Sequence, residues 1–446
     1  MHRLPVLAAL ILLAGPALAC ALPPSIVLTL PTGYYMAAAA ATVALTAWLA
    51  RHGAPAGLAP RVLWTARWTP PLMLTSYLSL LGLIGLLFLG FAGARDPMHN
   101  LLTLIVWTGI WVALPLASML LGNLWQGLNP WTGIVRLTRQ MLGRQGGIGL
   151  ARLGHWPAVA GLLAFGWFML VSLSPDDPLV LARVITVYLL VIYILAVLEG
   201  EDWLARGEFL TVYLTALSRL APIWREGGRR LIGLPGAQIP GLPPLTRSEI
   251  AFLTLILAIL TFDGLMETFF WLALIGENPL EFTGRSAVRG VNSAGLLAAW
   301  ALTAATILGA ARWGAHLGRV PVPAGAVLLS FLAIAAGYHA AHYLLTLLTA
   351  GQYTLSALND PFFRGDALLG LEPFYVSMGF LTDPATMRLI WNLQFALILG
   401  AHLLALVLAQ RLTPAGTAPR AHLPMTILMV LYTVLGLWLL STARGL

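Results

Sequence analysis

The stretch IAFLTLILAILTFDGLMETFFWLALI (residues 250–275) decides the fold class of this chain. It is almost wholly apolar and exceeds the roughly 20 helical residues that cross the hydrocarbon core of a bilayer. Its centre carries two acids, Asp263 and Glu267. Because these acids are four residues apart, one helix places both carboxylates on the same face. An acid at mid-bilayer costs roughly 2.5 to 3.5 kcal/mol, so the sequence predicts partners for both.

A simple salt bridge does not supply those partners. The chain contains no lysine, and Arg183 is the only arginine inside any other apolar segment. The remaining candidates are protonation, hydroxyl or amide groups, a bound cation, and histidine.

Composition indicates a polytopic membrane protein. Hydrophobic residues make up 59% of the 446 residues, charged residues make up 9%, and the mean hydropathy is +0.85. The net charge of +8 comes from arginines dispersed over short loops, so a nucleic-acid partner is not expected. The single cysteine, Cys20, excludes an intrachain disulfide and a cysteine-based metal site.

The first 19 residues have the pattern of a signal peptide. A basic start precedes an apolar run, and Ala17-Leu18-Ala19 precedes Cys20, which predicts cleavage after Ala19. Two alternatives are a lipid-modified Cys20 at the mature N-terminus and an uncleaved additional helix.

The remaining chain predicts an all-α fold, a polytopic transmembrane helix bundle of about ten spans after a cleaved signal peptide. Residues 20–198 hold the first five spans, residues 199–249 form a cytoplasmic interfacial segment, and residues 250–446 hold the second five. The predicted spans are 32–50, 71–93, 101–122, 157–174, 178–198, 250–275, 293–311, 323–349, 386–409 and 423–441.

The distribution of arginine predicts how the spans are oriented. With the mature N-terminus outside, seventeen arginines fall on inner loops and seven on the outer side. This excess agrees with the positive-inside rule. The sequence therefore predicts that the mature N-terminus lies on the outer side of the membrane, which would be the periplasmic side of a bacterial inner membrane if the family resemblance described below holds.

Three histidines share the predicted membrane interior with the two acids. His339 and His342 are three residues apart in the span 323–349, and His402 lies in the next span. At 1.5 Å of rise per residue, all five groups fall within roughly 10 Å of the midplane. Nitrogen and oxygen donors of this kind suit zinc, iron or manganese. We therefore expect His339, His342, His402, Asp263 and Glu267 as metal ligands, with Asp263 and Glu267 also as catalytic acids or bases.

Other arrangements of the same residues remain open. A neutral histidine beside a buried acid is suited to a proton relay without metal. Two of the histidines are also sufficient to hold haem b, and structural hydrogen bonding is a third alternative.

Two further groups of charged residues have expected roles near the membrane surfaces. Asp360, Arg364 and Asp366 lie in the outer segment ALNDPFFRGDALLGLEPFY (residues 357–375), where ion pairing would close a lid over the bundle. The alternative is that these charged residues are simply solvated. Four acids beside inner arginines are expected to be solvated or ion-paired: Glu199, Glu201, Asp202 and Glu208.

Six segments together resemble one family, the polytopic bacterial membrane proteins known as fenitrothion hydrolases. They are WPAVAGLLAFGWFMLVS (156–172), SPDDP (174–178), LEGEDWLARGEFLTVYLTALSRLAP (198–222), LTFDGLMETFFW (260–271), NDPFFRGDALLG (359–370) and GAHLLALVLAQR (400–411). Two places depart from the family. Members often begin the mature chain with a His-Gly-type segment and end the ninth span with histidine before arginine, where this chain has Cys20-Ala21 and Gln410-Arg411.

The resemblance implies hydrolysis of a small lipophilic organophosphorus triester that reaches the protein from the lipid bilayer. A divalent metal would polarise the phosphoryl group, and Asp263 or Glu267 would act as general base. Two other classes of function remain open from the residues. One is a membrane transporter or metal- or proton-handling permease, and the other is a haem-binding redox or assembly subunit that works beside partner subunits.

Overall fold

The computed structural model describes residues 32–49, 60–65, 72–282, 284–318, 324–372, 376–414 and 417–442. The predicted signal peptide and Cys20 lie outside these ranges. Most of the described residues are helical, which confirms the all-α prediction. The helices up to residue 199 are α2 (Thr32–Leu49), α3 (Leu72–Ala92), α4 (Leu101–Leu104), the π-helix η3 (Ile105–Ala113), α5 (Leu114–Leu121), α6 (Trp125–Leu128), α7 (Trp131–Met141), α8 (Trp156–Val171) and α9 (Pro178–Glu199).

The later helices include the elements that carry the predicted site. They are α10 (Leu204–Gly207), α11 (Phe209–Ser218), α12 (Arg247–Leu265), α13 (Phe269–Leu274), α14 (Arg285–Gly318), α15 (Ala324–Leu328), α16 (Phe331–His342), α17 (Leu344–Asn359), α18 (Pro384–Arg411) and α19 (Leu423–Ser441).

Eight helical segments among the described residues are long and apolar enough to cross a membrane. They correspond to eight of the ten predicted spans. The other two predicted spans fall on α2, with 18 residues, and on α8, with 16 residues. The prediction of about ten spans therefore agrees with the helices of the fold.

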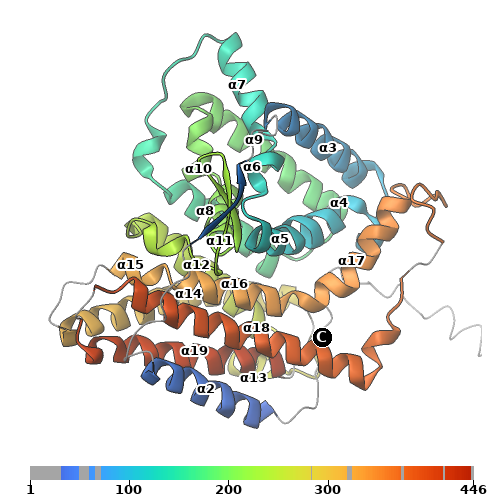
Figure 1. Cartoon of the computed structure of the whole chain (residues 1–446). Helices are drawn as coiled ribbons and strands as arrows, with labels where there is room; N and C mark the ends of the chain where they lie inside the picture. The colour runs from blue at the N-terminus through green and yellow to red at the C-terminus, as the bar shows by residue number, and fades with distance from the viewer. Residues whose placement is uncertain are drawn as a thin grey trace, which may run out of the picture.

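The helices form two groups in space. Helices α3 to α11 make up the upper group in Figure 1, and α14, α16, α18 and α19 lie side by side in the lower group. The N-terminal helix α2 joins the lower group, where it packs along α19 and α18. Helix α12 contacts α8 of the upper group as well as α14 and α16 of the lower group, so it links the two.

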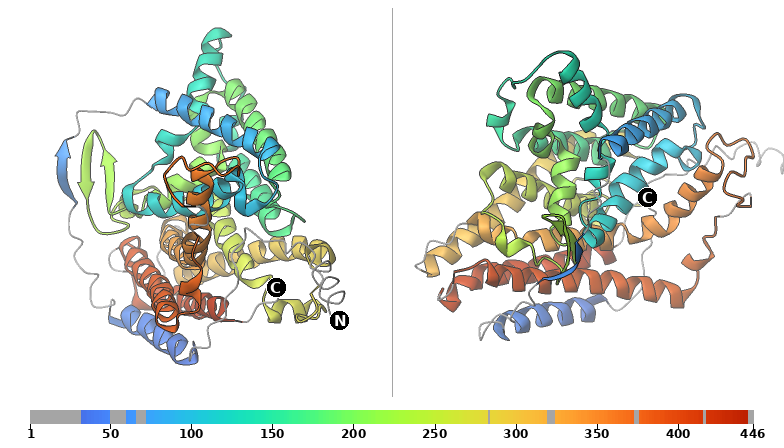
Figure 2. Two further views of the ribbon diagram at one scale, coloured as in Figure 1. Left: turned by 90° about the vertical axis from the view of Figure 1, so that its right-hand side faces the viewer. Right: turned by 45° about the horizontal axis from the view of Figure 1, so that its top comes forward.

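A small antiparallel sheet connects distant loops at the edge of the bundle (Figure 2). Strand β3 (Arg229–Ile232) lies between β1 (Arg61–Thr65) and β2 (Ile223–Glu226). The sheet ties the connection after α2 to the connection between the two predicted five-span halves.

Several predicted spans are interrupted. Helix α12 begins with a capping box, in which the Thr246 hydroxyl and the Glu249 carboxylate each accept a backbone N–H, but it ends at Leu265. The predicted continuous span 250–275 is therefore divided, and α13 restarts with Thr268 as its N-cap. The span predicted at 323–349 is likewise divided into α15, α16 and α17.

Helix α11 belongs to the protein core. Its side chains Phe209, Tyr213, Leu214 and Leu217 are all buried, and it packs against α5 and α8. Helix α11 is therefore the buried part of the segment 199–249, for which the sequence predicts a re-entrant or interfacial helix. Buried aromatic and aliphatic residues on most of its circumference explain why it is covered by other helices.

Helices α16 and α18 cross at a glycine close to the predicted histidines. A Cβ atom added at Gly337 would lie 2.2 Å from the Ala401 Cβ and 2.9 Å from the Leu397 carbonyl oxygen. Small residues at such crossings let helix backbones approach closely inside membranes. Gly337 therefore sets the spacing that positions His339 and His342.

We expect Gly337→Ala to destabilise the protein by about 1–3 kcal/mol, because the added methyl group forces α16 away from α18. The measurement is an SDS unfolding titration in mixed micelles. Gly400→Ala is the matched control, since a Cβ there meets no atom within 4 Å. Equal stability of the two variants would contradict the close crossing.

A second prediction concerns Asp383, the N-cap of α18. The hydroxyl and N–H of Thr386 donate to its carboxylate, at 2.5 and 2.9 Å, and they hold the pKa of Asp383 below its usual value. A depressed folded-state pKa stabilises the fold above the unfolded value of about 3.9, and this stabilisation is lost as the pH falls through the folded pKa.

We therefore expect Asp383→Ser, which keeps a capping oxygen that does not titrate, to show less acid sensitivity of its thermal midpoint than wild type. The midpoint is followed in detergent from neutral to acidic pH. A parallel acid dependence in both proteins would rule out Asp383 as the titrating group.

Candidate functional site

Asp263 and His342 form a buried acid–imidazole pair. His342 Nε2 lies 2.9 Å from Asp263 Oδ2, and the side chains are only 4% and 18% exposed. The Tyr343 hydroxyl donates to the same carboxylate oxygen at 2.6 Å. Asp263 comes from α12, whereas His342 and Tyr343 come from the end of α16. The structure therefore supplies the imidazole and hydroxyl partners that the sequence predicted for one of the two acids.

His339 lies one helical turn before this pair and has a partner from the other helix group. Its Nδ1 shares a hydrogen bond of 2.9 Å with the hydroxyl of Tyr213 on α11. Trp111, from the π-helix η3, stacks on Tyr213 and presents its ring to the edges of His339 and Tyr343. The His339 and Tyr343 rings are 4.8 Å apart. An aromatic and imidazole cluster thus joins the two helix groups next to the Asp263–His342 pair.

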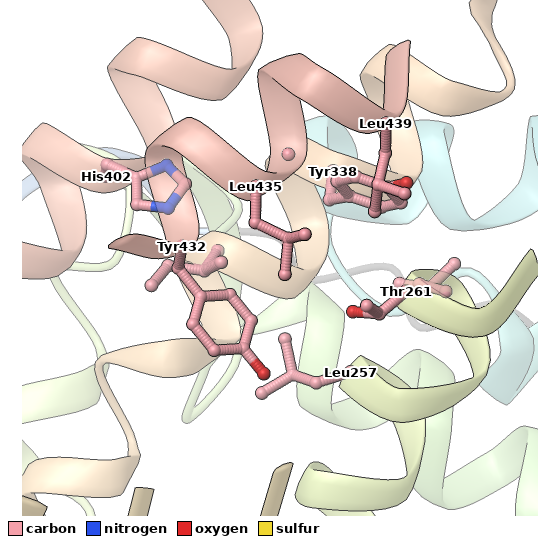
Figure 3. Close-up of a pocket in the computed structure, with 10 residues that line it drawn as sticks. Leu257, Thr261, Tyr338, His402, Tyr432, Leu435 and Leu439 are labelled. Atoms are coloured by element: carbon pink, nitrogen blue, oxygen red, sulfur yellow. The ribbon is translucent and has the colours of Figure 1, made fainter. Parts of the chain in front are cut away.

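His402 lies apart from the pair, on α18. Its Nδ1–H donates to the Ile398 carbonyl at 2.8 Å, within its own helix. His402 and Tyr338 line a cavity of about 20 Å³ between α12, α16, α18 and α19 (Figure 3), which is room for about one water molecule. The Tyr338 ring stacks on His342 at 5.5 Å, so this cavity borders the pair.

Glu267 is separated from Asp263 by the end of a helix. Helix α12 stops at Leu265, and Glu267 lies in the turn before α13. The expectation that one helix places both carboxylates on the same face is therefore wrong. Of the five predicted residues, the structure joins Asp263 directly to His342.

The candidate metal ligands do not form a cluster in the described part of the chain. Within the described ranges, no three side chains of histidine, cysteine, aspartate or glutamate lie close enough together to hold a metal ion. The Asp263–His342 pair offers one carboxylate and one imidazole. Binding of a divalent metal or of haem stays a prediction.

In each of the three predicted site histidines, one ring nitrogen has no hydrogen-bond partner among the described residues. These nitrogens are His339 Nε2, His342 Nδ1 and His402 Nε2. The other ring nitrogen is hydrogen-bonded to Tyr213 in His339, to Asp263 in His342 and to the Ile398 carbonyl in His402. Each imidazole is thus fixed on one side and available to accept or donate a proton on the other.

A buried glutamate anchors α11 in the position that brings Tyr213 to His339. Glu208 is fully buried, and its carboxylate accepts the N–H groups of Leu210 and Thr211, each at 2.7 Å, and the hydroxyl of Tyr188. Thr211 in turn accepts Trp125 Nε1–H at 2.9 Å. The expectation that Glu208 is solvated or ion-paired at the surface is wrong, because a helix N-terminus buried in the core needs an internal acceptor.

The other surface acids behave largely as expected. Glu201 pairs with Arg136 at 2.9 Å, which confirms one ion pair. Glu199 accepts three backbone N–H groups, from residues 149 to 151. Both carboxylates hold the loops on that side of the bundle.

The predicted outer lid is held by backbone contacts. The Asp360 carboxylate accepts the N–H groups of Arg364 and Gly365, at 2.9 and 2.7 Å, and the Arg364 guanidinium lies over the Phe362 ring. Phe362 and Phe363 pack against Phe88 and His99. Among the described residues, no ion pair joins Asp366 to Arg364. The role of these residues as a lid stays a prediction.

Sequence reasoning missed the aromatic residues around the pair. Tyr338 and Tyr343 flank the histidines in the motif YHAAHY, and this adjacency was the available signal. Tyr213 and Trp111 carry no such signal, because their role depends on which helices are neighbours.

We expect Tyr213→Phe to destabilise the protein by about 1–3 kcal/mol, since it leaves the fully buried His339 Nδ1 without its partner. SDS unfolding in mixed micelles measures the change. Tyr34→Phe is the control, because Tyr34 is 82% exposed. If the two variants unfold alike, the Tyr213–His339 hydrogen bond does not stabilise the fold.

Comparison with known proteins adds no relative. No family model matches this chain, and neither the curated proteins nor the solved structures contain a match.

Proposed function

We propose that this chain is an integral membrane permease that couples the movement of a small substrate to a proton, and that the Asp263–His342 pair binds this proton. Acids and histidines buried in membrane-spanning segments commonly mark ion pathways and proton relays. The carboxylate and the imidazole share one hydrogen bond of 2.9 Å, so the pair can hold one proton more or one fewer with small movements.

The observation that carries this proposal is the position of the pair at two helix ends. Asp263 lies two residues before the end of α12, and His342 is the last residue of α16. Secondary transporters typically build their sites from interrupted helices of this kind. The C-terminal end of α12 bears partial negative charge, which favours a bound cation such as a proton beside Asp263.

The contacts around the Asp263–His342 pair suggest how the pair would become exposed to water. The hydrogen bond between Tyr213 and His339 joins the upper helix group to α16, next to the pair. A relative movement of the two groups would break this contact and open the Trp111 side of the cluster. Such rocking between groups of helices is the usual form of alternating access.

The test uses protein reconstituted in liposomes that contain a pH-sensitive dye. A membrane potential is imposed, and proton entry is recorded without substrate and with a panel of small lipophilic and polar compounds. We expect substrate-stimulated proton entry in wild type and entry at the level of protein-free liposomes in Asp263→Asn and His342→Gln. Glu267→Gln is the matched control and should behave as wild type.

Infrared spectroscopy supplies a readout that needs no substrate. We expect a titrating carboxyl band that disappears in Asp263→Asn and shifts in frequency in Tyr343→Phe, which removes the hydroxyl donor. Absence of any band that depends on Asp263 across about pH 4 to 10 would overturn the proton-binding role.

Hydrolysis of a lipophilic organophosphorus ester is a second candidate, and one observation favours it. Asp263 holds His342 by Nε2 and leaves Nδ1 available, which is how a carboxylate orients a histidine general base. Release of a phenol by wild type and not by His342→Gln would support this candidate. Loss of that activity on treatment with a chelator would show whether a metal takes part.

A further inference from the structure

A hydrophobic cavity of about 330 Å³ lies within the upper helix group, and Trp111 on its wall also contacts His339 of the candidate site. Parts of α3, α6, α7, α8, α9 and α11 and of the π-helix η3 form its walls. Its volume falls at the lower end of the range of about 300–1,000 Å³ that is usual for small-molecule sites. Seven aromatic residues line it: Trp111, Trp125, Trp131, Phe165, Phe168, Tyr188 and Phe209.

Three of the four polar side-chain groups on the cavity wall are already hydrogen-bonded within the protein. Trp131 Nε1–H donates to the Leu189 carbonyl at 3.1 Å, Trp125 Nε1–H donates to Thr211, and the Tyr188 hydroxyl donates to Glu208. The fourth, Trp111 Nε1–H, has no partner among the described residues. A ligand would therefore be recognised mainly by apolar and aromatic contact, and a charged ligand would lose its hydration with at most one N–H donor to replace it.

The cavity reaches the face of the molecule that would meet lipid. Val184, Val187 and Val191 of α9 line it and are 39%, 62% and 46% exposed. Because α9 is one of the long apolar helices, exposed valines along it would contact hydrocarbon in a membrane. A ligand dissolved in the bilayer could reach the cavity past these side chains.

An unusual helix forms one wall. Residues Ile105–Ala113 form a nine-residue π-helix, which supplies Val106, Ile110 and Trp111 to the cavity. π-helical turns are rare and occur frequently at functional sites. The cavity and this irregular helix are independent observations at the same place.

We propose that this cavity binds an uncharged, ring-containing lipophilic molecule that enters from the bilayer between α8 and α9. Aromatic walls favour stacking and edge contacts with a ring, and the opening beside the α9 valines favours a ligand that is soluble in hydrocarbon. This binding site stands whether or not the Asp263–His342 pair handles a proton.

The test measures binding of pyrene, an uncharged aromatic probe, to the full chain in lipid nanodiscs. Quenching of tryptophan emission is followed and corrected with nanodiscs that lack protein. Wild type should bind pyrene saturably with about one site per chain. Ala164→Phe places a ring in the cavity, and Val187→Trp obstructs its mouth. Each should weaken binding at least about tenfold.

Ala305→Phe is the matched control, because Ala305 is an exposed position on α14 far from the cavity walls. It should bind pyrene as wild type does. Val187 is 62% exposed, so a larger side chain there is tolerated even if Ala164→Phe fails to fold.

Three results would overturn the proposal. The first is pyrene uptake by wild type that does not exceed partition into empty nanodiscs. The second is unchanged binding in both cavity variants. The third is a tightly retained phospholipid, seen by native mass spectrometry in wild type and lost in Val187→Trp, with no binding of pyrene; the cavity would then hold a structural lipid.

Discussion

The burial of one carboxylate, that of Asp263, is the constraint on which the arrangement of the helices around it depends. An acid inside a membrane-spanning helix is tolerated only with close hydrogen-bond donors. Both described donors, His342 and Tyr343, come from the last residues of α16. Helix α16 must therefore end beside α12, and its close approach to α18 through Gly337 fixes where that end lies. Glycine is also required at Gly264, where a Cβ atom would come within 2.3 Å of the Tyr338 hydroxyl oxygen.

The pair also depends on a contact between the two helix groups. Tyr213 reaches His339 because α11 is inserted into the core, and α11 can be inserted because Glu208 satisfies its first N–H groups. Burial of a helix N-terminus without such an acceptor would leave unpaired donors. A glutamate far from the pair along the chain thus helps to determine the surroundings of His339, and Trp111 connects those surroundings to the apolar cavity.

Hydropathy was sufficient to predict the helical class and the approximate positions of the spans, because apolar length is a local property of the sequence. It was also sufficient to single out Asp263 and His342, since charged and imidazole groups stand out in apolar segments. The ends of α12 and α16 could not be predicted this way, because Leu265 and Tyr343 are as apolar or aromatic as their neighbours. Glu208 was assigned to the surface because arginines flank it, yet the packing of α11 buries it. Which helices touch is decided by side-chain shape over the whole bundle, and a single sequence does not reveal it.

The longest helix provides a scale for depth. Helix α14 has 34 residues, about 50 Å at 1.5 Å per residue, which exceeds a hydrocarbon core of about 30 Å even at a tilt of about 40°. Its ends must therefore extend beyond the hydrocarbon core. Arg289 and Arg312 lie at the two ends of an apolar stretch about 35 Å long. Phe262, beside Asp263, packs against Gly295 of this helix, only about 9 Å along the axis from Arg289. Measured along the axis of α14, Asp263 therefore lies much nearer to the level of Arg289 than to that of Arg312, by a factor of more than two.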